Sequence, residues 1–314
     1  MKIIEYSKDI LPKETCISIG MFDGVHIGHI DILQKVCRTA DRLNSPSAVM
    51  TFDRNPADFF NSPKPTQSLI SLDRRIELIR EQNIDQLILV HFNREFAAIT
   101  ADDFIQHVLM DTMQIKAVVS GPNARFGARG EGDAERLNKK FNGSFEIHVV
   151  PFAEYRGQAV SSTRIRREIA NGNLAHAAVM LGRPVAVSGT VVKGHAVGRT
   201  LGVPTANIMP DHGAIPPTGI YACTVDRDGH SFKAVSCIGH RPTFSSHSDR
   251  PEPVVETHIL GMDTNLYDEH LRVLFFNKLR DEKKFNSAVE LKSAMEEDIR
   301  SVAAMELPGK APHG

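Results

Sequence analysis

The stretch that most constrains the fold is SIGMFDGVHIGHIDILQKV, residues 18–36. An apolar run ends in its first half, the chain bends at Asp23-Gly24, and apolar residues then recur with a helical period. This order predicts a buried strand that passes through a tight turn into a helix. The apolar residues of the predicted helix are Ile27, Ile30, Leu33 and Val36.

His26 and His29 flank Gly28 at the start of this predicted helix. The first backbone N–H groups of a helix have no partner within it and carry partial positive charge, so a phosphate binds well there. Two imidazoles can donate hydrogen bonds to a phosphoryl group as charge builds on its oxygens, and a glycine lets a phosphate or a flat base approach the backbone. We therefore predict a phosphate-binding catalytic turn. A metal site and surface histidines without a role are the two alternatives.

The composition favours small ligands over polymers and membranes. With 314 residues the chain is long enough for about two domains, and its formal net charge of −1 does not favour nucleic acid or an anionic membrane. No apolar run approaches the ~18 residues that a membrane span needs, and the N-terminal segment lacks a signal-peptide pattern. The four cysteines contain no CxxC pair, so we expect a soluble cytoplasmic protein with reduced thiols. The sequence leaves self-association open.

The first half of the chain alternates short apolar runs with helical patterns. Such alternation predicts an α/β domain with a doubly wound parallel sheet and right-handed crossovers. Ligands of such sheets bind beyond the carboxyl ends of the strands, so Asn55, which follows one predicted strand, is a candidate contact; a plain loop is the alternative. No GxGxxG fingerprint follows a strand. The predicted strands are 16–22, 47–52, 86–92, 115–120 and 145–152, and the predicted helices are 27–43, 71–83 and 101–113.

Two later segments of this half have features of anion sites. GPNARFGARGEG, residues 121–132, is rich in glycine and arginine and contains Asn123, and we predict that it folds over a phosphate or a flavin phosphate. Ser162, Thr163 and Arg166 lie where another helix is predicted to begin, which we interpret as a second anion site. A solvated loop and an ordinary helix cap are the alternatives. We expect the two helix starts to converge on one nucleotide.

The helical pattern runs to about Leu181, and the segments then become short, β-branched and alternating. We therefore place the first domain at 1–184 and a small antiparallel barrel at 185–306. A final helix is predicted at 287–304. The tail at 307–314 is predicted to be disordered.

Two features of the predicted barrel carry chemistry. In GHAVGRTLGVPTANI, residues 194–208, glycines let the backbone wrap a phosphate chain, and Thr205 and Asn207 offer neutral oxygen ligands for Mg²⁺ that phosphates already hold. Glu256 lies on a predicted strand, where a solvated edge position is the ordinary interpretation. Near a phosphate-binding loop, however, it is placed to take a proton from an attacking hydroxyl. The other candidate contacts of this segment are Gly194, Gly198, Arg199 and Gly202.

The whole pattern resembles the bacterial bifunctional riboflavin kinase/FAD synthetase family, and the HxGH turn resembles the signature of the nucleotidylyltransferase superfamily. The resemblance spans about residues 3–304 and is carried by FDGVHIGH, TFDRNP, RFG, SSTRIR, LGRP, GRTLGVPTANI, GIYACTV, IGHRPTF, VETHIL and LYDEHLRVLFFNKLRDEKKF. It implies a Rossmann-like adenylyltransferase domain with a parallel sheet, followed by an antiparallel β-barrel riboflavin kinase domain with a terminal helix. The implied ligands are riboflavin, FMN, FAD and ATP, with Mg²⁺ as cofactor.

The resemblance also implies roles for single residues. Glu256 is the implied base of the kinase, with Thr205 and Asn207 assisting Mg²⁺ and the nucleotide. A base suits this reaction because riboflavin presents a neutral hydroxyl, whereas FMN presents a phosphate that is already an anionic nucleophile and needs mainly positioning. The residues implied in adenylyl transfer are His26, His29 and Arg166, and the other implied contacts are Gly20, Phe22, Asp23, Gly24, Gly28, Asn55, Asn123, Ser162, Thr163, Gly194, Gly198, Arg199 and Gly202.

Two positions depart from the family pattern. Asn55 stands where the family usually has His, and Pro122-Asn123-Ala124 stands where it usually has an aromatic residue. Loss of an imidazole and of a stacking face would weaken the adenylyl site, so a riboflavin kinase with a degraded first domain is one alternative. A flavin-binding regulatory protein without turnover is another, although a pure binder has no use for the carboxylate of Glu256. A nucleic-acid binder is least favoured because the sequence has no basic stripe with interleaved aromatic residues.

Overall fold

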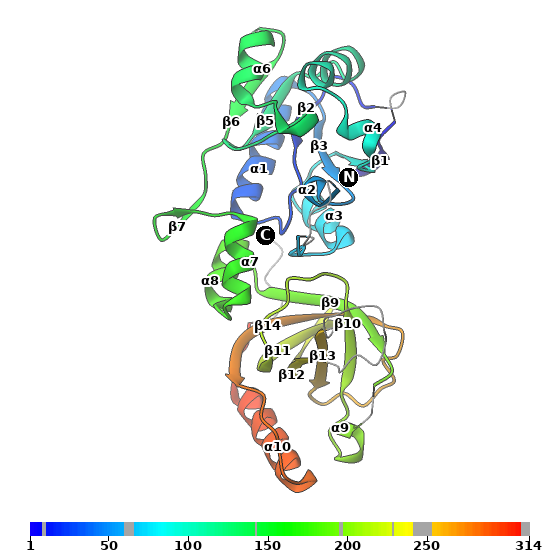
Figure 1. Ribbon diagram of the computed structural model, residues 1–314, viewed down its shortest axis with the longest axis vertical. Coiled ribbons are helices and arrows are strands. Elements are labelled where there is room, and N and C mark those ends of the chain that lie inside the picture. The colour runs from blue at the N-terminus through cyan, green and yellow to red at the C-terminus, as the bar shows by residue number, and fades with distance from the viewer. Residues whose placement is uncertain are drawn as a thin grey trace. The chain divides into compact units, whose positions relative to one another are not determined.

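The computed structural model describes residues 1–7, 11–59, 66–141, 143–194, 197–227, 229–240 and 253–308. The chain divides into two compact units, Met1–Thr66 with Leu72–Ser161 and Gln67–Ser71 with Ser162–Gly314. Each unit contains a β-structure of its own (Figure 1). Three features of the sequence lie partly outside the described residues: the IGHRPTF motif, the segment 194–208, and the predicted tail.

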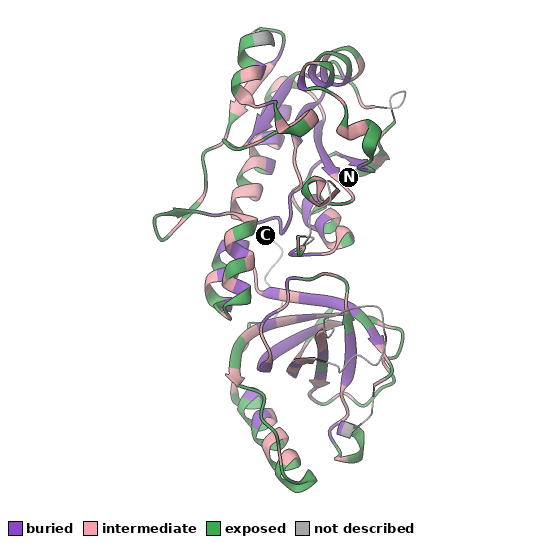
Figure 2. Cartoon of the chain, in the orientation of Figure 1, coloured by how far each residue is buried: buried purple, intermediate pink, exposed green. Residues whose placement is uncertain are grey.

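A six-stranded parallel sheet forms the centre of the first unit. Its strands are β1 (Lys2–Glu5), β2 (Cys16–Ile19), β3 (Ser47–Phe52), β4 (Gln86–Val90), β5 (Ala117–Ser120) and β6 (Glu146–Val149). They follow the order β1-β4-β3-β2-β5-β6, and every neighbouring pair is parallel. The four inner strands are almost wholly buried (Figure 2), as expected where helices cover both faces of a parallel sheet. The predicted α/β class is confirmed.

Helices connect most of these strands, and a hairpin follows β6. They are α1 (Ile27–Leu43), α2 (Pro56–Phe59), α3 (Leu72–Arg80), α4 (Arg94–Ala97), α5 (Ala101–Asp103), the π-helix η1 (Phe104–Thr112), the 3-10 turn η2 (Ala128–Gly130), α6 (Ala134–Phe141), and the hairpin of β7 (Glu154–Tyr155) and β8 (Gln158–Ala159). The helix predicted at 101–113 is therefore α-helical only in its first turn and continues with the wider π-helical turn. Segments of this type often lie next to functional sites.

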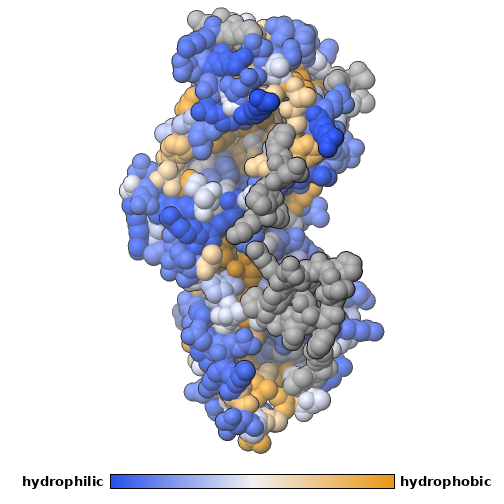
Figure 3. Space-filling view, viewed as in Figure 1, coloured by the Kyte–Doolittle hydropathy of each residue, from blue (hydrophilic) through white to orange (hydrophobic). Residues whose placement is uncertain are grey.

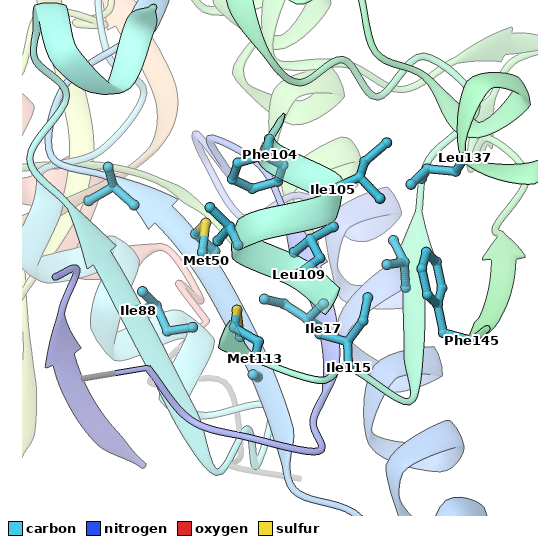
Figure 4. Packing of buried hydrophobic residues seen from close by; sticks show 14 residues of the cluster. Ile17, Met50, Ile88, Phe104, Ile105, Leu109, Met113, Ile115, Leu137 and Phe145 are labelled. Atoms are coloured by element: carbon cyan, nitrogen blue, oxygen red, sulfur yellow. The ribbon is translucent and has the colours of Figure 1, made fainter. Parts of the chain in front are cut away.

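One hydrophobic cluster of the first unit lies between η1 and the sheet. In Figure 4, Phe104 and Leu109 of η1 lie near Met50 of β3 and Ile17 of β2, and Ile105 extends toward Leu137. Full burial of each such side chain contributes roughly 1.5–3 kcal/mol. This packing fixes the sheet whose strand ends carry the first candidate site.

The second unit contains a closed antiparallel barrel preceded by two helices. Its elements are α7 (Ser162–Ala170), α8 (Leu174–Leu181), β9 (Val185–Val192), α9 (Val197–Thr200), β10 (Ala206–Pro210), β11 (Gly219–Arg227), β12 (His230–His240), β13 (Pro253–Ile259), β14 (His270–Arg280) and α10 (Ala288–Ala304). The strands follow the order β10-β13-β12-β11-β14-β9, and β9 closes the barrel against β10. The predicted barrel and terminal helix are confirmed.

Two details differ from the sequence-based prediction. The helix predicted to run unbroken to about Leu181 is two helices, because the chain turns at Gly172 with a φ of +77°. Both of these helices, α7 and α8, belong to the same compact unit as the barrel. The boundary at residue 184 stays a prediction about functional domains.

Candidate active sites

β2 leads into α1 through a turn with unusual backbone geometry. Phe22, Gly24 and Val25 have positive φ angles of 49°, 83° and 37°. A β-branched residue such as Val25 rarely adopts this region, and holding a residue there costs roughly 1–3 kcal/mol. Between these residues Asp23 is only 6% exposed. Strained backbone of this kind concentrates at binding and catalytic sites.

His26 and His29 are brought together at the start of α1. His26 is the N-cap, and its Nδ1 accepts a hydrogen bond from the His29 N–H at 3.3 Å, which leaves the proton of the neutral ring on Nε2. The two rings stack with centroids 3.6 Å apart and 16° between their planes. The centroids of the Phe22 and His29 rings are 5.2 Å apart. A Cβ atom at Gly28 would lie 3.4 Å from the His26 ring, which is an ordinary van der Waals contact.

A cavity of about 460 Å³ adjoins the carboxyl ends of β2 and β3. Gly20 and Asn55 line it, as the sequence predicts for a ligand site at this edge. Asn55 also caps the short helix α2, since its Oδ1 accepts from the Ala57 N–H at 3.0 Å. Asn123 is exposed and is not among the lining residues, so its predicted contact is not part of this cavity. Sequence reasoning did not single out the aromatic lining, Phe52, Phe92, Phe96, Phe104 and Phe126.

The glycine-rich segment 121–132 forms an ordered hairpin beside this cavity. Phe126 and Gly132 exchange backbone hydrogen bonds of 3.1 and 2.9 Å, and a Cβ at Gly132 would lie 2.4 Å from the Phe126 ring. Arg125 and Arg129 of the same hairpin line the cavity, and Arg125 pairs with Asp133 at 2.8 Å. Phe126 thus gives the loop an aromatic face on the cavity, although positions 122–124 have none.

Ser162, Thr163 and Arg166 begin α7 in the second unit. Thr163 is exposed, and the Nε of Arg166 donates to the Gln67 carbonyl at 2.8 Å, which ties α7 to the segment 67–71. The starts of α1 and α7 belong to different units. Their convergence on one nucleotide stays a prediction.

In the barrel, Glu256 of β13 is the direct register partner of Asn207 of β10. Directly opposed residues of antiparallel strands point to the same face, with Cβ atoms about 4.5–5.5 Å apart. Glu256 is exposed, whereas Asn207 is 6% exposed. Thr205, just before β10, lines a cavity with Glu256 and also lines the neighbouring cleft with Asn207. The structure therefore places these three residues where two hollows of the surface meet.

The segment before β10 packs directly on these side chains. A Cβ at Gly194 would lie 2.2 Å from Asn207 Nδ2, and one at Gly198 would lie 2.3 Å from the Val203 carbonyl oxygen and 3.3 Å from Thr205 Oγ1. Two further candidate contacts are Gly202, which turns the chain with a φ of +81°, and Arg199, which is exposed and lines the cleft.

The cavity that contains Glu256 has a volume of about 320 Å³, and α10 contributes Leu291, Met295 and Ile299 to its lining. A bidentate ion pair at its edge joins α10 to β14: Arg280 Nε lies 3.0 Å from Asp298 Oδ1, and Nη2 lies 2.7 Å from Oδ2. Both residues line the cavity. Sequence reasoning missed this pair because its members lie on different elements.

Cys237 is the β12 register partner of Glu256 and lines the same cavity. Burial, reinforced by the carboxylates of Glu282 and Glu256, raises the pKa of the Cys237 thiol to about 12. A thiol with this pKa is protonated at neutral pH and is a poor nucleophile. Cys237 is therefore not a candidate nucleophile of this cavity.

Comparisons with known proteins agree with the division into two parts. A model of the FAD synthetase family matches residues 8–164, and a model of the riboflavin kinase family matches residues 181–306. The chain is 32% identical over 311 residues to a bifunctional riboflavin kinase/FMN adenylyltransferase of Pseudomonas fluorescens, which covers 98% of this chain and 99% of that protein. It is 36% identical over 290 residues to the protein with the same description from Escherichia coli strain K12, with 91% of each chain covered.

Among solved structures, a protein from Streptococcus pneumoniae described as a macrolide-efflux protein is 29% identical to this chain. It superposes with a TM-score of 0.87 over 98% of this chain and 100% of its own. Within the part of the chain that the structure describes, no helix is both long and apolar enough to span a membrane. Hydrophilic residues cover most of the face drawn in Figure 3.

Proposed function

The chain belongs to the bifunctional riboflavin kinase/FMN adenylyltransferase family, and we propose that it phosphorylates riboflavin to FMN in its barrel and adenylylates FMN to FAD in its first unit. ATP is the co-substrate of both steps. The observation that carries the kinase assignment is the meeting of Glu256, Thr205 and Asn207 at the junction of a cavity and a cleft.

In the kinase step the apolar part of the 320 Å³ cavity receives the flavin ring, and the ribityl chain reaches toward Glu256. The Glu256 carboxylate accepts the proton of the terminal hydroxyl as its oxygen attacks the γ-phosphorus of ATP. The bond between the γ-phosphorus and the bridging oxygen breaks, and ADP leaves. Thr205 and Asn207 hold the phosphate chain on the side of the cleft.

The donors present fit Mg²⁺. Thr205 and Asn207 offer neutral oxygen atoms, which suit a hard cation whose other ligands are phosphate oxygens and water. The close packing of Gly194 and Gly198 keeps both side chains against the loop that would hold the phosphates. When bound, Mg²⁺ would neutralise charge that builds on the transferred group.

Adenylyl transfer needs a different set of groups. An oxygen of the FMN phosphate attacks the α-phosphorus of ATP, and pyrophosphate leaves. Because this nucleophile is already anionic, the protein needs to align it and to stabilise charge. His26, His29 and the N–H groups at the start of α1 are placed to donate to ATP phosphates. The 460 Å³ cavity suits FMN, because its aromatic lining matches the flavin ring and Arg125 and Arg129 match the phosphate. Ser162, Thr163 and Arg166, at the start of α7, are also proposed to bind phosphate.

Two further parts of the proposal concern organisation and location. We assign the adenylyltransferase function to residues 1–184, which include α7 and α8 of the second unit, and the kinase function to residues 185–306; the family models, which match residues 8–164 and 181–306, support a division in this region. We assign the protein to the cytoplasm because all four of its cysteines are free thiols, as in proteins of reducing compartments.

Chromatography of the products formed from riboflavin, ATP and Mg²⁺ over time tests the function. FMN followed by FAD is the expected result, whereas FMN alone would select a kinase with a degraded first domain, and binding without products would select a regulatory binder. Glu256→Gln should slow FMN formation by roughly 10²–10⁴-fold while riboflavin binding is retained. Glu296→Gln, on the exposed part of α10, is the matched control and should leave the rate unchanged.

A further inference from the structure

Arg75 is a buried cation at the edge of the first candidate site. It lies on α3 and is 3% exposed. Its Nη1 donates to the carbonyl oxygens of Met21 at 2.8 Å and Phe52 at 2.9 Å, and it lies 3.3 Å from Thr51 Oγ1. One guanidinium group therefore joins the chain segments that leave β2 and β3.

These two carbonyl groups lie where backbone pairing stops. Met21 directly precedes Phe22, the first residue of the strained turn, and Phe52 is the last residue of β3. A half-buried carbonyl at such a point needs a side-chain donor. Thr51 Oγ1 donates to the Met21 carbonyl at 3.3 Å, and Arg75 is the charged donor that reaches both the Met21 and the Phe52 carbonyls.

The charge of Arg75 is balanced locally. Burial lowers the pKa of the guanidinium, and the carboxylates of Asp23 and Asp53 act against this effect. Asp23 is itself in the turn and 6% exposed, and Asp53 accepts a hydrogen bond from the Phe92 N–H at 3.0 Å. A buried charge is stable only when it is compensated. The Arg75 guanidinium and the Asp23 carboxylate of the turn therefore stabilise each other.

We propose that Arg75 is a positioning residue for adenylyl transfer, which fixes the turn between β2 and α1 so that His26 and His29 stay stacked at the helix start. This inference rests on the proposed FAD synthesis in the first unit. Arg75 acts through the turn, so its loss should lower kcat for FAD formation more than it changes the KM for ATP.

The test compares Arg75→Met and Arg75→Lys with Arg74→Met. Arg74 is the adjacent residue of the same helix and pairs with Glu77 and Glu81 at 2.8 and 3.1 Å, so its loss removes a similar side chain outside the turn. FAD synthesis from FMN is measured well below each variant's unfolding temperature, and riboflavin kinase activity of the same sample reports whether the second unit is intact.

We expect a loss of at least 100-fold in kcat for Arg75→Met, about tenfold for Arg75→Lys, which keeps the charge but not the planar fork, and less than twofold for Arg74→Met. Partial recovery of kcat in Arg75→Ala by added methylguanidinium would support the positioning role. A variant that is only less stable would be folded at low temperature, so the added cation would not change its kcat.

A rate within threefold of wild type for Arg75→Met overturns the inference. If Arg75→Met does not fold, wild-type FAD synthesis by Arg75→Lys overturns it. Absence of FAD synthesis in the wild-type protein would instead refute the proposed function.

Discussion

The substitution Gly194→Ala should slow the kinase reaction by about 100-fold while the protein stays folded. The new Cβ would lie 2.2 Å from Asn207 Nδ2 and 2.5 Å from its Cγ. Non-bonded atoms rest at about 3.5 Å, so one of the two groups must move by roughly 1 Å. Asn207 is 6% exposed, and its backbone is paired in the barrel with β9 and β13. The atoms that can move are therefore its side-chain amide or the segment that contains Gly194. A misplacement of about 1 Å in a group that orients reacting atoms can cost about 100-fold in rate.

The assay is kcat for FMN formation at saturating riboflavin and Mg-ATP, together with calorimetric binding of ADP in the presence and absence of Mg²⁺. Gly239→Ala is the matched control. Gly239 also lies in the barrel, but its new Cβ would meet its nearest neighbour at 3.6 Å, an ordinary contact. FAD synthesis from supplied FMN serves as a second control, because its proposed contacts lie outside the barrel.

The reasoning is refuted if Gly194→Ala forms FMN within threefold of the wild-type rate and binds ADP with the same dependence on Mg²⁺. A slow reaction in both glycine variants would also contradict it, since the effect would then come from the loss of glycine and not from contact with Asn207.

Three further predictions concern single contacts. Hydrogen bonds from Arg42 and then His148 lower the pKa of Glu146 from 4.5 to about 2, so these contacts stabilise the fold above pH 4.5 and lose this effect as the pH falls toward 2. The difference in Tm between wild type and Glu146→Gln should close over that window. Asp298→Asn should lower the free energy of unfolding by roughly 2 kcal/mol, because it leaves a partly buried Arg280 without its anion, and an unchanged urea midpoint would contradict this. Gly132→Ala should reduce FAD synthesis but not kinase activity, since its methyl group would lie 2.4 Å from a phenyl ring that lines the first cavity; equal loss of both activities would count against the local explanation.

The architecture could be predicted from the sequence because each unit repeats one simple pattern. Continuous apolar runs such as SAVMTF, residues 47–52, are buried on both faces of a parallel sheet, and alternating runs such as VVETHIL, residues 254–260, have one face in the barrel interior. The start of α10, predicted from the apolar pattern, is also stabilised by local hydrogen bonds. Ser287 accepts from the Glu290 N–H at 3.2 Å, and the Glu290 carboxylate accepts from the Asn286 N–H at 3.0 Å.

Features that depend on distant neighbours could not be predicted in this way. Arg75 follows another arginine on a short amphipathic helix, where a charged residue ordinarily indicates the solvated face, and its burial depends on carbonyl groups 23 and 54 positions away. The break at Gly172 was missed because a single glycine is compatible with a helix as well as with its end. The π-helical turns of η1 depend on packing, and helical periodicity does not distinguish them from an α-helix.

The glycines of the barrel loop require a different explanation from the one that the sequence favours. Glycine before a phosphate site is usually attributed to the freedom of the backbone to wrap the ligand, yet a Cβ at Gly194 would overlap Asn207, and one at Gly198 would press on Thr205. Both glycines lack the positive φ that only glycine adopts easily, so their role here is close packing. Gly194 and Gly198 therefore pack directly on Asn207 and Thr205, and this packing fixes the two side chains that would hold the nucleotide. A change in either partner should then have the same effect on the kinase rate, and Gly194→Ala combined with Asn207→Ala should be little slower than Asn207→Ala alone.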